Sequence, residues 1–362
     1  MKFKTVIISL IILFLINSIS YSSPEIDAES GLLIDVKSGR ILYTLNPHKK
    51  LPMASTTKIM TALVALENGK LDEKIKVKKE FVGVEGSSIY IYEGEEISLK
   101  DLLYGLMLRS GNDAAMLIAD NVAGDTDKFI ELMNNKAKEI GALNTNFTNP
   151  HGLEDENHYT TAYDLGLITR EALKNDDFKE IVSSKSWTAD RDKNNYFYNK
   201  NKTLWQYEGG DGVKTGYTKR AGRCLVSSAT RSGMQLVSIV LNDGNWFNDC
   251  YKLLDYGFDN YKPYFLYDER QFIKNIKVED GSKEYLPVVT NTSCILPLKE
   301  KEKENIKITI DLPEKITPPI KEGKVLGKIS VYLNGKLIYA SDLISKEEVK
   351  ELNFFTKLKK SL

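Results

Sequence analysis

Apolar and polar positions along the chain follow patterns that predict strands first and a helix next. Two short runs rich in apolar and β-branched residues, 31–36 and 40–45, flank a turn at 37–39, and this arrangement predicts a β-hairpin. In residues 55–67 the apolar positions follow helical spacing, and Gly69 ends the run as a C-cap would. We therefore expect a hairpin followed by a helix near the start of the chain.

Helical spacing continues through the middle of the chain. Ser98 with Asp101 three residues later is typical of a helix N-cap, and Thr161 with Asp164 repeats the pattern. Apolar stripes after these caps and between them predict helices at residues 102–108, 114–122, 127–140 and 161–173. The middle of the chain is therefore expected to be mainly helical.

Strand-like runs return after the helices. Val, Ile, Leu and Thr dominate three segments, with a tight turn at 232–233 between the last two. They predict strands at 213–218, 224–230 and 236–241, followed by a helix at 246–256. Strands at both ends with helices between them indicate an α+β fold, in which an antiparallel sheet takes strands from distant parts of the chain and is flanked by helices.

Helical spacing is absent beyond about residue 263. Short apolar runs alternate there with glycine, proline and charged turns, at residues 272–278, 285–289, 306–312, 325–333 and 337–339. This pattern predicts a small all-β domain. We therefore expect two folded domains, 24–262 and 263–344, between two terminal segments of different character.

The first terminal segment, residues 1–23, has the layout of a secretory signal peptide. Lys2 and Lys4 precede an apolar run at 6–16, and several serines follow. The run is shorter than the roughly 20 apolar residues that a membrane span requires. We expect cleavage near residues 20–23 and an exported protein. The alternative is an uncleaved N-terminal anchor.

The second terminal segment, residues 345–362, carries apolar residues three or four positions apart, accompanied by lysines. These residues are Val349, Leu352, Phe355, Leu358 and Leu362. An apolar stripe with flanking lysines can lie on an anionic membrane surface. We expect this tail to associate with a membrane. The alternative is a helix packed on the β domain.

Composition and charge exclude several classes of protein. The 362 residues include 50 Lys and Arg against 50 Asp and Glu, and a formal net charge of zero argues against a nucleic-acid-binding protein. A hydrophobic content of 42% excludes a wholly disordered chain. The cysteines are too few and too far apart for a disulfide framework or a metal site, and we expect them to be small buried side chains: Cys224, Cys250 and Cys294.

Ser55 and Lys58 carry the first signal of chemistry. Motifs for nucleotides, zinc and common hydrolases (GxGxxG, the P-loop, HExxH and GxSxG) are missing, so we expect no metal and no cofactor. If Ser55 begins the helix, Lys58 lies one turn later on the same face. A neutral lysine can take the proton that makes a serine hydroxyl nucleophilic, and a helix N-terminus offers N–H groups to an oxyanion. Alone, this spacing is common on lysine-rich surfaces.

Two further motifs follow along the chain. Ser110 and Asn112 lie in a turn between two expected helices, where a plain polar connection is the simplest interpretation. Lys214, Thr215 and Gly216 lie early in an expected strand. The lysine and threonine can face a carboxylate there, and the glycine lets a ligand lie close to the strand backbone. In this order, SxxK, SxN and KTG form the tripartite pattern of the penicillin-recognising serine enzymes.

The sequence around the three motifs resembles the D-alanyl-D-alanine carboxypeptidases, which are low-molecular-mass penicillin-binding proteins of the bacterial envelope. The resemblance extends from about residue 29 to the C-terminus and is carried by residues 53–61, 109–115, 149–153 and 211–218. It implies a DD-peptidase/β-lactamase-like catalytic domain and a β-rich C-terminal domain. It also implies an exported serine enzyme, outside the cytoplasmic membrane, that removes the terminal D-alanine from peptidoglycan stem pentapeptides and is inhibited by β-lactams.

The resemblance implies which groups carry the reaction. Ser55 would attack the carbonyl between the two terminal D-alanines and form an acyl-enzyme, and Lys58 would be the general base. Ser110 would relay a proton to the leaving D-alanine. The backbone N–H groups of Ser55 and Tyr217 would form the oxyanion hole.

The same resemblance implies a set of substrate-binding residues. Asn112 would hold Lys58 and the substrate amide, and Lys214 would keep the local field positive. Thr215 would bind the terminal carboxylate beside Gly216. Lys200 lies where relatives often carry a basic residue near that carboxylate. We expect His151 and His158 to shape a loop, since their spacing does not resemble a metal site.

Two other classes and one activity remain open at this point. A class A β-lactamase needs a glutamate that activates water; Glu171 and Asn175 have the required spacing but lie far beyond Ser110, in an expected helix. A non-catalytic peptidoglycan-binding protein could keep the fold, although the intact Ser55 and Lys58 argue against it. Endopeptidase action on cross-linked stem peptides is also left open.

Overall fold

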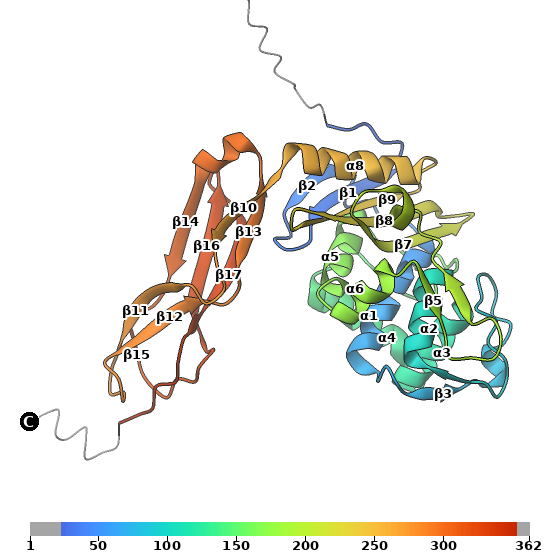
Figure 1. The fold of residues 1–362 in the computed structure, drawn as a ribbon, viewed down its shortest axis with the longest axis horizontal. Coiled ribbons are helices and arrows are strands. Elements are labelled where there is room, and N and C mark those ends of the chain that lie inside the picture. Colours follow the sequence, from blue (N-terminus) through green and yellow to red (C-terminus); the bar gives the residue numbers. More distant parts are fainter. Residues whose placement is uncertain (1–22, 353–362) are drawn as a thin grey trace, which may run out of the picture.

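The computed structural model describes residues 23–352, which form an α+β part (β1 to α8) and a β part without α-helices (β10 to β17) that stand side by side (Figure 1). This arrangement confirms the expected fold class. The expected signal peptide, apart from Ser23, and the end of the expected tail, 353–362, lie outside the described residues. Within 23–352, no helix combines the length and apolar character needed to cross a membrane.

The α+β part contains every α-helix of the described chain. The helices are α1 (Lys58–Asn68), α2 (Leu99–Tyr104), α3 (Asn112–Ala123), α4 (Thr126–Ile140), α5 (Ala162–Ala172), α6 (Asp176–Ser183), α7 (Thr203–Gln206) and α8 (Trp246–Asn260). Its strands are β1 (Ser30–Asp35), β2 (Ile41–Leu45), β3 (Lys74–Lys76), β4 (Glu96–Ser98), β5 (Ser186–Thr188), β6 (Tyr196–Tyr198), β7 (Gly210–Thr218), β8 (Gly222–Arg231) and β9 (Met234–Leu241).

The central sheet joins the two ends of the α+β part. Its strand order is β2-β1-β9-β8-β7, and every neighbouring pair is antiparallel. β1 pairs with β9, with Ser30 opposite Leu241, so strands from distant parts of the chain lie side by side as the sequence predicted. β7 lies at the edge of this sheet, where alternate backbone N–H groups have no strand partner.

Side chains of the central sheet alternate between two cores because strand residues point to opposite faces in turn. Leu32 and Ile34 of β1 join a core with the helices below the sheet, whereas Leu33 joins a second core with α8 above it (Figure 1). Within the first core α1 is the central helix, and every residue from Lys58 to Ala65 is buried. The first turn of this helix is a 3₁₀ turn, Ala54–Thr57. Lys58 is therefore placed in the interior of the fold.

The segment before Ser110 differs from a plain helix. Ser98 caps α2 as expected, because its Oγ accepts from the backbone N of Asp101 at 3.0 Å. The helix expected to reach residue 108 instead changes to a π-helical turn at Gly105–Arg109 and ends at Ser110 with a φ of 65°. Such turns are frequent at functional sites. The short pairs β3–β4 and β5–β6 and the helices α6 and α7 were not predicted.

The β part contains one six-stranded sheet and one two-stranded sheet. Its strands are β10 (Lys262–Tyr267), β11 (Phe272–Val278), β12 (Tyr285–Thr290), β13 (Cys294–Leu298), β14 (Ile306–Asp311), β15 (Lys315–Ile316), β16 (Val325–Leu333) and β17 (Lys336–Ser345). Arg40, directly before β2 in the α+β part, donates to both carboxylate oxygens of Glu302 at 2.7 and 3.0 Å and to the Pro297 carbonyl. This contact fastens the two parts together.

The position of Val349 contradicts the prediction that this residue belongs to a membrane-facing stripe. The side chain of Val349 is fully buried and packs with Val278, Leu286 and Ile320 in a small core of the β part. Its backbone N and O each bond with Ile320 at 2.9 Å, so the segment is extended there. Val349 is therefore a core residue, because its backbone pairs with the β part and turns the side chain inward.

Truncating this side chain should weaken the β part. We expect Val349→Ala to lower its stability by about 1–3 kcal/mol, because a buried apolar side chain loses its contacts and leaves a cavity. The measurement is hydrogen exchange of the β12 amides. Leu337→Ala, at a side chain that is 51% exposed, is the matched control and should leave the exchange rates unchanged. Unchanged protection in Val349→Ala would contradict the packing described here.

Candidate active site

Lys58 is the point at which three distant segments of the chain meet. Its Nζ lies 3.2 Å from Ser55 Oγ, one turn earlier on the same helical face. The same Nζ donates to Asn112 Oδ1 at 2.7 Å and to the backbone carbonyl of His151 at 2.6 Å. The structure thus brings the first two predicted motifs together around one buried amine.

The surroundings of Lys58 disfavour its charged form. Burial, followed by the nearby Lys214 and Lys200 cations, lowers the pKa of Lys58 well below its ordinary value, while the carboxylate of Asp113 opposes this shift. A lysine with a lowered pKa has a larger fraction of neutral amine, which is the form that can accept a proton. The amine beside Ser55 is therefore suited to act as a base.

Lys214 lies on edge strand β7. Its side chain is buried, and its Nζ donates to the carbonyl of Thr215 at 3.1 Å. Burial and the nearby Lys200 cation lower the pKa of Lys214 to about 7. Lys200 itself lies next to the π-helical turn, since its backbone N donates to the Leu108 carbonyl at 3.3 Å. Lys58 and Lys214 are thus both buried, and the Lys200 charge lies close enough to affect both amines.

The SxN turn presents its two polar side chains differently. The Ser110 Oγ is buried and has no hydrogen-bond partner within residues 23–352. The Asn112 amide is fixed at both ends, because its Oδ1 accepts from Lys58 while its Nδ2 donates to the Glu85 carbonyl at 2.6 Å. The backbone N of Asn112 donates to the Ser87 carbonyl, also at 2.6 Å. The orientation of Asn112 therefore depends on the loop that contains these two carbonyls.

Gly216 allows β7 to lie directly against the start of the first helix. A Cβ atom at this position would lie 2.9 Å from Ser55 N, closer than real Cβ atoms come, and 3.1 Å from Thr56 N, which is also tight. The backbone at Ser55 thus faces the edge of the sheet. The KTG motif occupies the fifth to seventh of the nine residues of β7, later in the strand than expected, because the strand begins at Gly210.

The two histidines lie in a loop that packs against the 3₁₀ turn containing Ser55. His158 Nε2 lies 2.7 Å from Thr57 Oγ1, and its Nδ1 accepts from the backbone N of Thr148 at 3.1 Å. Burial lowers the pKa of His158 to about 4 and, together with Lys58, that of His151 to about 3. Both rings are therefore neutral at physiological pH. The carbonyl of His151 that binds Lys58 was missed, because a backbone group leaves no mark in a sequence.

The remaining predicted residues have other surroundings. Glu171, considered for a β-lactamase, pairs with Lys174 at 2.6 Å, and Asn175 caps α6 by accepting from Phe178 N at 3.0 Å. The Tyr217 side chain is 63% exposed beside the site. In the described part of the chain, no group of three or more His, Cys, Asp or Glu residues could hold a metal ion. The site consists of lysines, hydroxyls and amides.

Comparisons with known proteins find family models that match both parts of the chain. A family model described as D-alanyl-D-alanine carboxypeptidase matches residues 17–245, and one described as penicillin-binding protein 5, C-terminal domain, matches residues 261–351. The chain is 33% identical to D-alanyl-D-alanine carboxypeptidase DacF of Bacillus subtilis, covering 93% of this chain and 89% of that protein. It is 35% identical to DacC of Escherichia coli, with coverages of 92% and 87%.

Solved structures show the same similarity in three dimensions. Penicillin-binding protein 5 from Haemophilus influenzae superposes with a TM-score of 0.75 at 30% identity, covering 91% of this chain and 99% of that one. A mutant of the Streptomyces K15 DD-transpeptidase superposes with a TM-score of 0.63 at 34% identity, covering 66% of this chain and 100% of that one. The first similarity spans both parts of the molecule.

Replacing Lys214 should stabilise the fold in a pH-dependent way. Between its folded pKa of about 7 and the ordinary value of 10.5, the unfolded chain keeps a proton that the folded chain has released, so wild-type stability rises with pH. Lys214→Met removes this penalty, and we expect a gain of up to about 4 kcal/mol at neutral pH and below, shrinking toward alkaline pH. Denaturant unfolding across this pH range measures the gain. A gain independent of pH, or a loss, would contradict the burial of a lowered-pKa lysine.

Proposed function

Because the chain belongs to the D-alanyl-D-alanine carboxypeptidase family, we propose that Ser55 is the nucleophile with which it removes the terminal D-alanine from peptidoglycan stem peptides. The family is shown by the match over residues 17–245 and by relatives more than 30% identical over most of the chain. The predicted family, fold class and serine-type carboxypeptidase activity are thereby confirmed. One observation carries the assignment of the site: the buried Lys58 amine lies 3.2 Å from the Ser55 hydroxyl.

Acylation begins with a proton transfer from Ser55 to Lys58. Neutral Lys58 takes the proton of the Ser55 hydroxyl while Oγ attacks the carbonyl carbon between the two D-alanines. Lys214 and Lys200 favour the neutral form of Lys58 before the reaction, since each lowers its pKa. After the transfer, the new ammonium keeps its bonds to the Asn112 and His151 oxygens, which hold it in place.

The negative charge that develops on the substrate carbonyl needs hydrogen-bond donors. The backbone N–H groups of Ser55 and Tyr217 would supply them, one from the start of the helix and one from edge strand β7. Gly216 supports this assignment, because the missing side chain lets the two backbones approach each other. The donors belong to rigid elements and need no rearrangement during the reaction.

The leaving D-alanine must gain a proton when its C–N bond breaks. Ser110, whose buried hydroxyl has no partner in residues 23–352, can pass the proton from Lys58 to the departing amine nitrogen. Asn112 would hold the substrate amide, and Thr215 with the Lys214 charge would hold the terminal carboxylate. A water molecule then hydrolyses the Ser55 ester, with Lys58 again as base. A β-lactam would acylate the same serine and leave slowly.

Mass spectrometry of the intact protein tests Ser55 directly. Wild type should gain the mass of one penicillin and convert a stem pentapeptide to the tetrapeptide with release of D-alanine. Ser55→Ala should do neither, because no nucleophile remains. Ser183→Ala, which removes an exposed serine on α6, is the control and should behave as wild type. Penicillin attached to Ser55→Ala would place the nucleophile elsewhere.

We also propose that the chain is exported and that its C-terminal tail binds the outer face of the cytoplasmic membrane. The support is the sequence beyond the β part, where Phe355, Leu358 and Leu362 alternate with lysines. The buried Val349 takes no part. This position would bring the enzyme close to newly made peptidoglycan.

Vesicle co-sedimentation tests the tail. The chain without residues 1–23 should bind anionic phosphatidylglycerol vesicles and lose about 1 kcal/mol of attraction for each lysine replaced in the tail. High salt should weaken the binding, since the lysine term is screened. A matched chain ending at Leu352 should stay in solution. Equal sedimentation of both chains would exclude the tail as the membrane-binding segment.

A further inference from the structure

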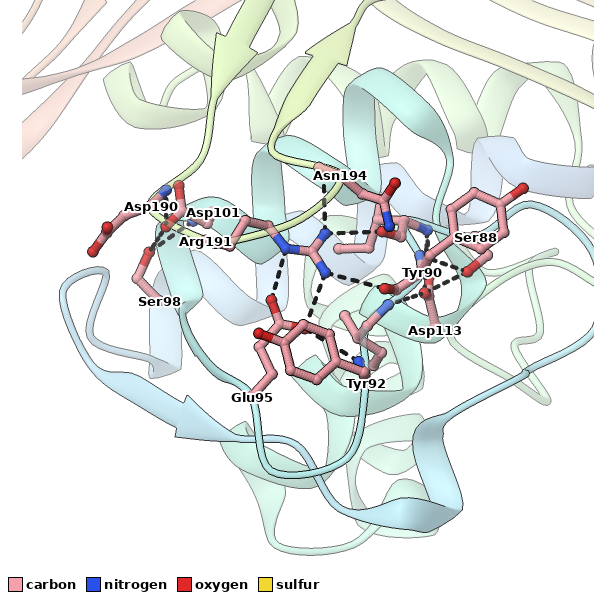
Figure 2. Close-up of polar contacts among 12 residues, drawn as sticks. Ser88, Tyr90, Tyr92, Glu95, Ser98, Asp101, Asp113, Asp190, Arg191 and Asn194 are labelled. Carbon is pink, nitrogen blue, oxygen red and sulfur yellow. Dashed lines mark hydrogen bonds and ion pairs between the residues drawn. The ribbon is translucent and has the colours of Figure 1, made fainter.

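The loop that orients Asn112 is itself held by a buried ion pair that the reaction does not use. Arg191, between β5 and β6, donates to both carboxylate oxygens of Glu95 at 2.7 and 2.9 Å (Figure 2). Neither side chain is exposed beyond 2%, so the pair has almost no contact with solvent. Burying two charges costs free energy that can exceed their mutual attraction, so the presence of the pair does not by itself imply a more stable fold. Its position next to the SxN motif suggests a different role.

Arg191 also binds backbone carbonyl groups of the loop that contains residues 85–91. Its two terminal nitrogens donate to the carbonyls of Ile89 at 2.8 Å and Tyr90 at 3.2 Å, so Glu95 and these carbonyls together occupy most of the guanidinium donors (Figure 2). Tyr90 has a φ of 59°, an uncommon conformation for a residue with a side chain. Such a conformation persists only when its surroundings enforce it. Arg191 is one of the groups that enforce it.

Asp113 holds the same loop from the opposite side. Its carboxylate accepts from the backbone N of Ile89 at 3.0 Å and of Ile91 at 3.2 Å, and from Ser88 Oγ at 2.6 Å (Figure 2). Asp113 directly follows Asn112 at the start of α3. The peptide groups around residue 89 are thus fixed between Arg191 and the N-terminus of α3.

The loop then reaches Asn112 itself. Two residues and four residues before Ile89, the carbonyls of Ser87 and Glu85 accept from the backbone N and the Nδ2 of Asn112, both at 2.6 Å. Gly86 between them fits closely, since a Cβ there would lie 2.6 Å from Asn112 Nδ2. With Nδ2 held by Glu85, the amide oxygen must face Lys58.

We propose that the Arg191–Glu95 ion pair positions the catalytic amide: by fixing residues 85–91 it sets the orientation of Asn112, and through it the placement of the Lys58 amine against Ser55. Arg191 and Glu95 are positioning residues, because neither has a bond to Ser55 or Lys58. This inference rests on the proposed function, since it assumes that Lys58 activates Ser55. Small displacements of reacting groups reduce rates strongly even when binding is kept.

The test separates the rate of acylation from the fraction of folded protein. Wild type and the double variant Arg191→Met/Glu95→Leu, which leaves no unpaired buried charge, are mixed with saturating fluorescent penicillin. We expect the first-order acylation constant to fall about tenfold or more while almost all of the protein is finally labelled. The apparent dissociation constant for penicillin should change little. A merely structural role would lower the labelled fraction and leave the rate constant of the labelled molecules unchanged, and this result would overturn the inference.

Two further variants keep the result decisive. Ser88→Ala removes one bond between the loop and Asp113 without touching the ion pair, and should slow acylation about threefold. If the double variant does not fold, an unchanged rate in Ser88→Ala overturns the inference. Arg170→Met is the matched control, because Arg170 also donates to two backbone carbonyls, those of Val36 and Lys37, away from Ser55. Its rate should equal that of wild type.

The outcomes for the two proposals differ. If wild type is not acylated on Ser55, the proposed function fails. If wild type is acylated on Ser55 and both loop variants react at the wild-type rate, only the positioning role fails.

Discussion

The burial of Lys58 is the constraint on which the rest of the α+β part depends. A lysine in the interior is unfavourable unless its charge is lost or its donors are bonded, and here both conditions contribute. The central helix α1 removes the amine from water, and Asn112 and His151 bond it. The nearby Lys214 and Lys200 then shift the balance toward the neutral amine. The price is a less stable fold, which is common at sites whose groups must react.

The fold supplies this arrangement by bringing rigid elements to one point. The 3₁₀ turn before α1 carries Ser55, and the π-helical turn before α3 presents the SxN residues. Edge strand β7 lies against the 3₁₀ turn. Gly216 permits the last contact, since a side chain there would meet the backbone at Ser55. The β part stands outside this assembly and is fastened to it by Arg40 and Glu302. A tail that binds a membrane would therefore hold the α+β part near that membrane as well.

The sequence predicted those features that depend on side-chain chemistry or on long periodic segments. The helix spacing around Lys58, the cap at Ser98 and the pairing of the first strand with a late strand all appear in the structure. The residues of the three motifs lie close together, and the roles proposed for them rest on this arrangement. Short elements such as β3 and β5 were missed because three residues cannot show a period.

Other features were beyond the reach of the sequence for physical reasons. The His151 carbonyl is a backbone group, and Arg191 and Glu95 are 96 positions apart in unremarkable surroundings, so only the fold reveals that they pair. Val349 was placed wrongly because three-residue spacing of apolar side chains does not distinguish a surface stripe from an extended core segment.

The central claim, that Lys58 is a buried amine with a lowered pKa, is tested most directly by NMR titration of the lysine Cε and Nζ signals. Lys58 should lose its proton at a pH well below that of the surface lysines, with a pKa well below 10.5. Titration of Lys58 together with the surface lysines would contradict it.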